Sequence, residues 1–589
     1  MKLKIANFSG IAPRLSAKLL ADNQAQIARN CRLQSGEIRP FRAPLKIAAS
    51  LVDDAHTIFR LRGAWLSWSG RVSVAASPIA DTDGEGRIYF TGDGVPKKTW
   101  YAYAISSPSH APGANWKTLA VKSLTAAPTL ASAAGSVPVG TYAYVATLIE
   151  RFGPAGAGVL EESRPSPAAL ITLAAVGGVT VTRGAIPTGS TAEFWCVYRS
   201  TSAGEYQLVS ENIPISTTSF TDNLSSPKST VLPSNDWHEP PDDMQGLVAM
   251  PNGVLAAFRG NEILFSEPWY PHAWPVGYRQ TIPASIVSIA PAGAALIVLT
   301  ESTPFIISGT HPASMSQEKI DVVSPCVSAM SVVSDGYNVF YAARDGVAAI
   351  SSSGQHSLVT RALLDYEDWS ALEPESIVAK SYYGSYLAFY EDRSETPYKT
   401  RGMVLQPNDT PPLVQLDVGA IAAFGDFFLT STGEIYEFDA HPINKTRAEW
   451  RSKIFSLPRP ANFGAIQIDA DFAALSDSDE YNEKVAQVRA RNAGYLDDVW
   501  CGEVGGLLGC YTIAGSQIEA LPSLADERAI TVTLFSEGLP RVTASFENAK
   551  SRMLPSGYVG RDVEVSISAD VPVYSVTLAS TASELRGIS

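Results

Sequence analysis

The stretch that decides the fold is NGVLAAFRGNEILFSE, residues 252–267, because its pattern returns four more times before residue 441. The other copies are GAALIVLTESTPFIISG (293–309), GYNVFYAARDGVAAISS (336–352), GSYLAFYED (384–392) and GDFFLTSTGEIYEFDA (425–440). A glycine turn, an apolar run, a polar break and a second apolar run are typical of a β-hairpin. The copies start about 40 to 48 residues apart, which is the spacing of blades in a β-propeller. One hairpin cannot bury both of its faces, so we expect the copies to pack around a common axis.

Two further regions complete the predicted architecture. Residues 56–104 carry hairpin patterns of the same kind, which raises the count to about six blades and assigns 51–125 and 226–445 to the propeller. Residues 126–225 instead show evenly spaced alternating strands with frequent turns, the pattern of an Ig-like or fibronectin-like sandwich inserted into the ring. Its expected aromatic core comprises Tyr142, Tyr144, Trp195 and Tyr198. Cys196 has no cysteine partner within this region, so an inter-sheet disulfide is not expected.

The two ends of the chain differ from the repeats. Residues 1–50 lack regular periodicity, and Ser16 to Ala28 is a candidate for a short helix. Residues 446–589 read as strands around one helical stretch, 476–496, whose acidic start and basic finish suit the helix macrodipole. We expect an α+β platform domain there, with one strand that pairs with an early blade to close the ring, because open sheet edges are avoided.

Composition limits the classes of function. A chain of 589 residues is too long for one core, and its formal net charge of −14 argues against binding nucleic acid by counterion release. No window is apolar for long enough to span a membrane, and the N-terminus lacks a signal-peptide pattern. Five scattered cysteines suit synthesis in a reducing cytoplasm, and Cys501 and Cys510 are more simply explained as two free thiols than as a pair.

Four motifs resemble those of tail nozzle (tail tubular) proteins of short-tailed bacteriophages. One is the N-terminal segment with Gly10, Pro13, Arg14, Asn23, Asn30, Ser35 and Gly36. The others are the loop SEPWYPHAWP (266–275), the strand TESTPFIISG (300–309) and the segment WRSKIFSLP (450–458). The resemblance covers most of the chain outside 126–225.

The resemblance implies a structural virion protein of the tail, made in the cytoplasm of a host bacterium. Six copies would form a ring below the connector and enclose a channel through which double-stranded DNA leaves without specific binding. Each propeller would radiate from a central platform, residues 446–589, and tail fibres or spikes would dock near it. The acidic balance agrees, because a repulsive lumen lets a duplex pass without sticking. Head-to-tail contacts would close such a ring with cyclic symmetry.

The candidate functional residues are therefore contacts rather than catalysts. Arg14, Arg29 and Arg32 are candidates for docking on an acidic connector, although ordinary surface salt bridges are an equal alternative. The platform residues Trp450, Lys484, Arg489 and Arg491 are candidates for ring or channel contacts, with a solvated helix face as the alternative for the three cations. Trp269, Tyr270, His272 and Trp274 crowd into one loop, which we predict to serve an interface or packing rather than sugar binding.

No catalytic, cofactor or metal signature is found. DTDGEGRIYFTG (81–92) imitates a calcium loop but ends in Gly92 instead of glutamate, so we interpret it as a polar hairpin tip. The histidines lack zinc spacing, and neither G-x-S-x-G nor a P-loop occurs. Two rivals stay open: a propeller glycoside hydrolase or lyase with an acidic axial pocket, and a receptor-binding protein whose insert recognises a host glycan.

Overall fold

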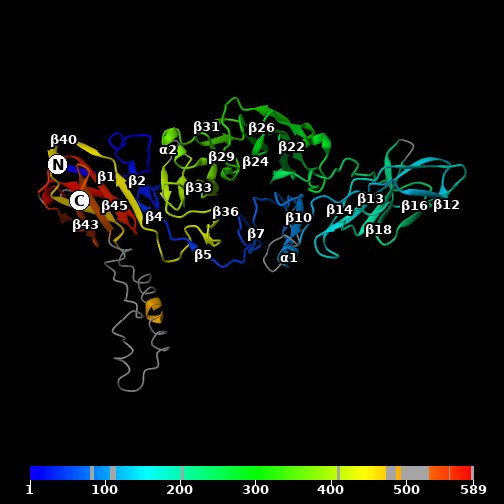
Figure 1. The fold of residues 1–589 in the computed structure, drawn as a ribbon, viewed down its shortest axis with the longest axis horizontal. Helices are drawn as coiled ribbons and strands as arrows, with labels where there is room; N and C mark the ends of the chain where they lie inside the picture. The colour runs from blue at the N-terminus through cyan, green and yellow to red at the C-terminus, as the bar shows by residue number, and fades with distance from the viewer. Residues whose placement is uncertain are drawn as a thin grey trace, which may run out of the picture.

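The computed structural model describes residues 1–79, 85–106, 115–200, 204–394, 396–407, 412–472, 486–491, 530–555 and 557–585. The fold is mainly β. Figure 1 shows three bodies in a row, with the N-terminal and C-terminal strands together at one end, a ring of sheets in the middle and a second group of strands at the far end.

Antiparallel sheets of consecutive strands form the middle body, as the repeats predict. The first two are β8 (Ser73–Ala76), β9 (Arg87–Thr91), β10 (Lys97–Trp100) and β11 (Lys117–Thr118), then β20 (Gln245–Ala249), β21 (Leu255–Arg259), β22 (Glu262–Phe265) and β23 (Gln280–Thr281). The next two are β24 (Ile286–Ala292), β25 (Ala295–Thr300), β26 (Phe305–Ser308) and β27 (Ser316–Lys319), then β28 (Val333–Ser334), β29 (Asn338–Ala343), β30 (Gly346–Ser351) and β31 (His356–Leu358). The strands β32 (Val378–Tyr382), β33 (Ser385–Asp392), β34 (Lys399–Leu405) and β35 (Leu413–Leu416) follow in the same way. Four of the five quoted copies contain the predicted hairpin, whereas 384–392 forms the single strand β33.

The remaining part of the ring differs from the sequence prediction in two ways. The repeat pattern predicts one blade for residues 56–104, but these residues form parts of two sheets. The first is the hairpin of β6 (Thr57–Leu61) and β7 (Ala64–Trp68), and the second is most of the β8–β11 sheet. The last sheet, β36 (Ala422–Phe424), β37 (Phe427–Leu429) and β38 (Ile435–Glu437), takes its fourth strand from the N-terminal segment, β5 (Leu45–Ile47). The predicted closing strand from the C-terminal domain is therefore wrong, because β5 already occupies the free edge of β38.

Buried apolar side chains join each sheet to the next. One cluster packs β6–β7 on β8–β11 and another packs β8–β11 on β20–β22. The contacts continue through each later pair of neighbouring sheets. The circle is completed where Ile58 and Trp65 pack against Leu429 and Ile435 of the last sheet. Consecutive antiparallel sheets packed face to face around one axis are the architecture of a β-propeller.

The second group of strands is inserted between β11 and β20. One sheet is β12 (Thr129–Val137), β16 (Gly177–Thr182) and β19 (Ser219–Asp222). The other is β14 (Val159–Glu162), β13 (Gly140–Phe152), β17 (Phe194–Ser200) and β18 (Tyr206–Pro214), with β15 (Ala169–Leu173) also paired to β13. Tyr144 and Trp195 are fully buried between the sheets and Tyr142 packs against them, but Tyr198 lies in a separate cluster on the outer face.

The third body is a two-sheet sandwich built from both ends of the chain. One sheet contains β1 (Lys2–Ala6), β46 (Val573–Ala579), β41 (Ala465–Ala470) and β44 (Arg552–Met553). The other contains β2 (Ala25–Arg29), β39 (Ala448–Ser452), β45 (Gly560–Ala569), β42 (Ile530–Ser536), β43 (Leu539–Phe546) and β40 (Phe455–Ala461). Because β2 also pairs with β35, this second sheet runs without a break from the sandwich into the ring. The helix predicted from Ser16 to Ala28 is wrong, since its C-terminal part is β2.

Helices are few and short in the described residues. They are α1 (Tyr101–Ala104), α2 (Tyr366–Ser370), α7 (Ala582–Leu585) and the 3-10 turns η1 (Val276–Tyr278), η2 (Pro312–Ser314), η3 (Ala329–Ser331) and η4 (Pro374–Ser376). Residues 486–491 are helical and belong to the predicted platform helix, most of which lies outside the described residues, as do Cys501 and Cys510. A short hairpin of β3 (Cys31–Arg32) and β4 (Arg39–Pro40) follows β2.

The core of the sandwich depends on the N-terminal segment. Trp450 has no exposed surface, meets the ring of Phe8 edge-on at 4.8 Å between ring centroids, and donates from Nε1 to the carbonyl of Ser9 at 3.0 Å. Truncation of a fully buried tryptophan typically costs about 3–5 kcal/mol.

We expect Trp450→Ala to lower the free energy of unfolding of the sandwich by about 3–5 kcal/mol, measured as a shift of the corresponding urea transition. Tyr337→Ala is the matched control, because Tyr337 is 73% exposed. An equal, small shift in both variants would mean that the N-terminal segment is not part of this core.

Candidate functional site: polar junctions and exposed contacts

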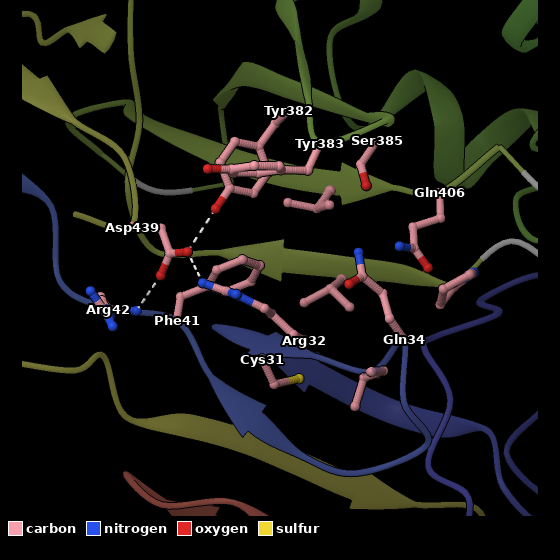
Figure 2. Close-up of a pocket in the computed structure, with 14 residues that line it drawn as sticks. Cys31, Arg32, Gln34, Phe41, Arg42, Tyr382, Tyr383, Ser385, Gln406 and Asp439 are labelled. Atoms are coloured by element: carbon pink, nitrogen blue, oxygen red, sulfur yellow. Dashed lines mark hydrogen bonds and ion pairs between the residues drawn. The ribbon is translucent and has the colours of Figure 1, made fainter. Parts of the chain in front are cut away.

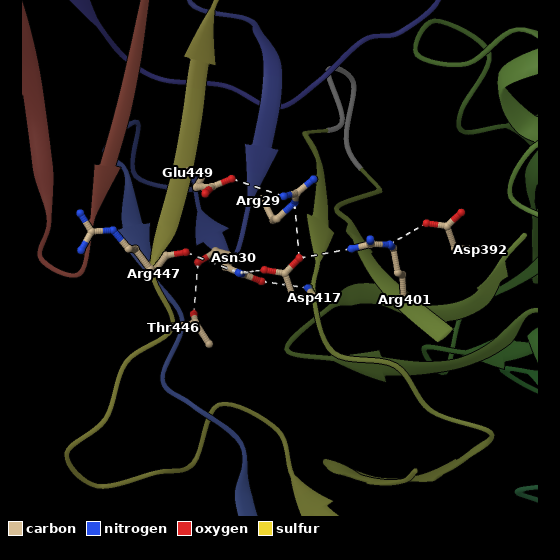
Figure 3. A network of polar contacts seen from close by, with 8 residues as sticks. All are labelled: Arg29, Asn30, Asp392, Arg401, Asp417, Thr446, Arg447 and Glu449. Carbon is tan, nitrogen blue, oxygen red and sulfur yellow. Dashed lines mark hydrogen bonds and ion pairs between the residues drawn. The ribbon is translucent and has the colours of Figure 1, made fainter. Parts of the chain in front are cut away.

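A polar network joins the ring to the sandwich (Figure 3). Asn30 donates from Nδ2 to Asp417 Oδ2 at 2.6 Å, and the backbone N–H of Asp417 donates back to Asn30 Oδ1 at 3.0 Å. Asn30 has a positive φ of 54°, a conformation that asparagine tolerates better than most residues. Because Asn30 directly follows β2 and Asp417 directly follows β35, this pair holds the two bodies in register.

Arginines extend this network on both sides of Asp417. Arg29 lies 3.4 Å from Asp417 Oδ1 through Nε and 3.4 Å from Glu449 Oε2 through Nη1. Arg401 reaches the same Asp417 oxygen at 3.4 Å and Asp392 at 2.6 Å. Arg29, which the sequence suggested as a connector contact, is therefore used inside the chain, and its side chain is 34% exposed.

A cavity of about 460 Å³ lies beside this junction, between the β3–β4 hairpin and the ring (Figure 2). Asp439 is its polar centre: it forms an ion pair with Arg32 and accepts from the Tyr382 hydroxyl at 2.6 Å and from the Arg42 backbone N–H at 2.6 Å. The Arg32 guanidinium lies 5.1 Å from the centre of the Phe41 ring, and burial lowers its pKa. Arg32 is thus an internal link as well.

Arg14 and the platform cations complete the predicted basic contacts. Arg14 is exposed and donates from Nη1 to the carbonyl of Arg361. Arg489 and Arg491 are exposed on helical residues 486–491. Lys484 lies outside the described residues. Trp450, by contrast, is a core side chain, so its predicted role as a surface contact is wrong for this chain.

The aromatic loop 266–275 divides into an exposed half and a buried half. Trp269 is 52% exposed, and its ring lies against Gly253. Tyr270 is 45% exposed, and its ring centroid lies 4.7 Å from that of Trp237. His272 is buried, and Trp274 is buried and donates from Nε1 to the carbonyl of Pro271 at 2.9 Å. Two of the four predicted contact residues are therefore buried, because Trp274 packs in a cluster with Phe152 and His272 lies beside Glu161 of the insert.

A buried ionic cluster fastens the insert to the ring, and sequence reasoning did not find it. Lys98 of β10 is fully buried, forms an ion pair with Glu161 of β14 and lies 3.3 Å from Glu150 of β13. Lys117 approaches Glu150 at 3.6 Å, and His272 Nδ1 lies 3.6 Å from Glu161 Oε1. The signal in the sequence was the pair of lysines 97 and 98 beside a run of aromatic residues, and the structure buries both lysines in β10.

Electrostatics in this cluster favour the charged forms. Burial opposes ionisation, yet Lys98 and His272 lower the pKa of Glu161 to about 2. Burial also opposes protonation of Lys98, but Glu161 and Glu150 outweigh it and raise the pKa of that lysine. A buried pair of this kind is strongly destabilised when one partner is removed, because the other charge stays in the interior.

A second cavity, of about 580 Å³, lies on the axis of the ring. The innermost strands β6, β8, β20, β24 and β32, the segment before β28 and the strand β36 all contribute to its lining. The described lining residues include Arg71 and Lys380 but no aspartate or glutamate.

The described residues show little that resembles other kinds of site. They contain no group of three or more histidine, cysteine, aspartate or glutamate side chains that could hold a metal ion. Asp81 and Asp83 of the calcium-like loop lie outside them. Every helix within the described ranges is too short or too polar to cross a bilayer.

Comparison with known proteins returns likenesses to solved structures only, since no family model and no curated protein matches. The chain is similar to BBS1N in complex with ARL6DN, with 11% identity and a TM-score of 0.26 over 69% of this chain and 100% of that one. It is similar to the Neurospora crassa Pan2 WD40 domain, with 9% identity and a TM-score of 0.23 over 55% and 91%. It spans 58% of the N-terminal domain of Nup159, with 8% identity and a TM-score of 0.20. These scores are low, so the architecture described above depends on the strand pairing and packing of this chain alone.

Substitution of Asn30 tests the junction between ring and sandwich. Asn30→Ala should lower the free energy of unfolding by about 2–4 kcal/mol. The substitution removes the hydrogen bonds between the Asn30 side-chain amide and Asp417, and it strains a left-handed backbone. Asn30→Gly avoids the backbone strain but also lacks the hydrogen bonds, so its melting temperature should lie between those of Asn30→Ala and the wild type. Identical transitions for both variants and wild type would contradict a role for this contact.

The pH dependence of unfolding tests the ionic cluster. The pKa of Glu161 is lower in the folded chain than the ordinary value of 4.5, so its stabilisation is fully present above that pH and is lost as the pH falls toward 2. At neutral pH, Glu161→Gln should cost about 3–5 kcal/mol. The difference in melting temperature between Glu161→Gln and the wild type should become smaller as the pH falls from 4.5 to 2. Glu211→Gln, at an exposed pair with Lys228, is the control and should change little.

Proposed function

We propose that this chain is a structural tail nozzle component of a short-tailed bacteriophage. The observation that carries the proposal is that two of the four motifs behind the resemblance, the N-terminal segment and the segment 450–458, meet at one junction. Gly10 lies so close to β35 that a Cβ there would fall 2.4 Å from the Leu413 carbonyl oxygen, which leaves room only for glycine. The carbonyl of Asn23 accepts from Ser9 at 2.7 Å, and that of Gly36 accepts from Phe8 at 2.8 Å.

Asn30 and Trp450 belong to the same junction, through Asp417 and Phe8. Residues from positions 10 to 36 and from position 450 thus form one structural unit between the ring and the sandwich. Motifs that are scattered in sequence and joined in space are expected when a resemblance reflects a shared architecture. This convergence supports the resemblance independently of the sequence pattern.

The proposal includes a finer reading of the fold. The ring is a seven-bladed propeller, with β6–β7 as a reduced blade and β5 as the strand that completes the last blade. The insert is an Ig-like sandwich, in which β12 and β16 of one sheet and β13, β17 and β18 of the other correspond to the central strands of that fold. The sandwich made from the two chain ends is the platform.

In this proposal the platform sandwich forms the central ring of about six copies below the connector. Each propeller then lies outside that ring, and the insert lies farthest out, as the row of bodies in Figure 1 suggests. The continuous sheet through β35, β2 and β39 would transmit load between platform and propeller. The net charge of −14 favours a lumen that repels DNA. The exposed half of the aromatic loop, Trp269 and Tyr270, is the proposed contact for a fibre or spike.

The hydrolase rival requires two carboxylates that face each other across a sugar, and it predicted them in an axial pocket. The described lining of the axial cavity has no carboxylate, which favours the structural proposal over this rival. The other rival is recognition of a host glycan by the insert, residues 126–225. It predicts that the full-length protein binds host cells through this insert, which a cell-binding assay tests.

The mass of the purified protein, alone and mixed with the connector of the same phage, tests the proposal. Six chains of 62.8 kDa predict a particle of about 377 kDa, and electron microscopy should show a ring with a central hole. Trp269→Ala combined with Tyr270→Ala should leave the ring intact and weaken fibre attachment to virions. A 62.8 kDa monomer under both conditions, or release of sugar from host envelopes, would contradict the proposal.

A further inference from the structure

The axial cavity contains two cations whose positions are set by rigid backbone. Lys380 is in the middle of β32, where its backbone pairs with Leu387 of β33. Arg71 lies two residues before the start of β8, and its carbonyl lies so close to Gly92 that a Cβ on Gly92 would approach it to 2.3 Å. Both residues line the same cavity of about 580 Å³.

Neither cation has a partner among the residues that the structure describes. Lys380 and Arg71 donate no side-chain hydrogen bond, form no ion pair and lie over no aromatic ring among the described residues. Arg71 is exposed and Lys380 is partly buried. Three other cations of low exposure are paired: Lys98 with Glu161, Arg199 with Asp222 and Arg451 with Glu564. Lys380 differs from these cations, because it has no partner among the described residues.

An unpaired cation surrounded by protein atoms is costly, because protein replaces part of its hydration. Burial lowers the pKa of Lys380, with no opposing contribution from a carboxylate. Burial also lowers the pKa of Arg71, although this side chain stays accessible to the solvent in the cavity. In a chain of net charge −14, a cavity with two cations and no acid among its described lining residues has the opposite sign to its surroundings.

We propose that the axial cavity is a binding site for a small oxyanion, a phosphate or sulfate group, with Lys380 and Arg71 as its charge partners. An anion in the cavity would supply the counter-charge that the described lining residues do not provide. The site is separate from the proposed nozzle contacts, which lie at the platform and on the aromatic loop.

The rest of the lining indicates what can accompany the anionic group. Phe59 and Phe424 lie 4.7 Å apart between ring centroids at the cavity wall, and Phe258 contributes a third ring. Apolar residues such as Ile58, Val248 and Ile289 surround them. The cavity is far larger than one inorganic phosphate, and its apolar wall suits the body of an organic phosphate or sulfate ester.

Thermal unfolding at constant ionic strength provides the test, with inorganic phosphate, phenyl phosphate and neutral phenol as separate probes. A ligand that binds only the folded state raises the melting temperature as its concentration rises. We expect both phosphates to stabilise the wild-type protein and phenol to have little effect. Stronger stabilisation by phenyl phosphate than by inorganic phosphate would identify an ester as the preferred source, and equal stabilisation would identify the free anion.

Two variants and one control complete the test. Lys380→Met combined with Arg71→Gln should weaken phosphate binding at least tenfold, whereas Lys380→Arg should retain it. Without phosphate, Lys380→Met should melt at a higher temperature than wild type, because it removes an unpaired charge. Lys319→Met, at an exposed position on β27, should behave as wild type.

The proposal is overturned if neither phosphate shifts the wild-type transition, or if both shift the double variant as much as the wild type. Equal stabilisation by phenol and phenyl phosphate would also overturn it, because the cavity would then recognise the apolar ring and not the anion. Binding measured by isothermal titration calorimetry should follow the same order among the variants.

Discussion

The pairing of the N-terminal segment with distant strands is the constraint on which the rest of this structure depends. β5 fills the open edge of β38, so the last sheet of the ring is complete only when residues 45–47 have returned to it. β2 pairs with β39 on one side and with β35 on the other, which makes one sheet of the sandwich and the ring. An unpaired edge in either place would leave backbone groups open to association with other chains. The first 50 residues therefore hold the ring closed and fix its position on the sandwich.

Charge is used in three different ways along the molecule. At the junction of ring and sandwich, Asp417 gathers Asn30, Arg29 and Arg401 at a partly exposed site, where each contact contributes modestly and geometry matters more than energy. At the base of the insert, Lys98 and its carboxylate partners are buried, so each depends strongly on the others. In the axial cavity, Lys380 and Arg71 have no partner within the described part of the chain, which is the arrangement expected where a ligand provides the missing charge.

The residues that the sequence suggested as contacts fall into two groups, those that hold the bodies of the chain together and those that stay exposed. The arginines and aromatic residues that the sequence suggested as outward contacts are largely used to hold the bodies together: Arg29 and Arg32 form internal ion pairs, and Trp274 is buried. What stays exposed in the aromatic loop is Trp269 and Tyr270, held in place by the buried half of the same loop. A stiff support beneath two exposed rings is a favourable design for a contact surface, because little conformational freedom is lost on binding.

The sequence by itself determined the local units: the hairpin repeat, the position of the insert between residues 126 and 225, and the acidic character of the chain. These follow from periodicity and turn residues, which act over a few positions. The tertiary structure alone decided which strand closes the ring, that residues 56–104 form two sheets, and that Trp450 and His272 are buried. It also decided that Lys98 is paired, whereas no described residue pairs with Lys380. A strand pattern shows which face of a segment is apolar, but the partner of an edge or a charge comes from residues hundreds of positions away, and only the folded chain brings them together.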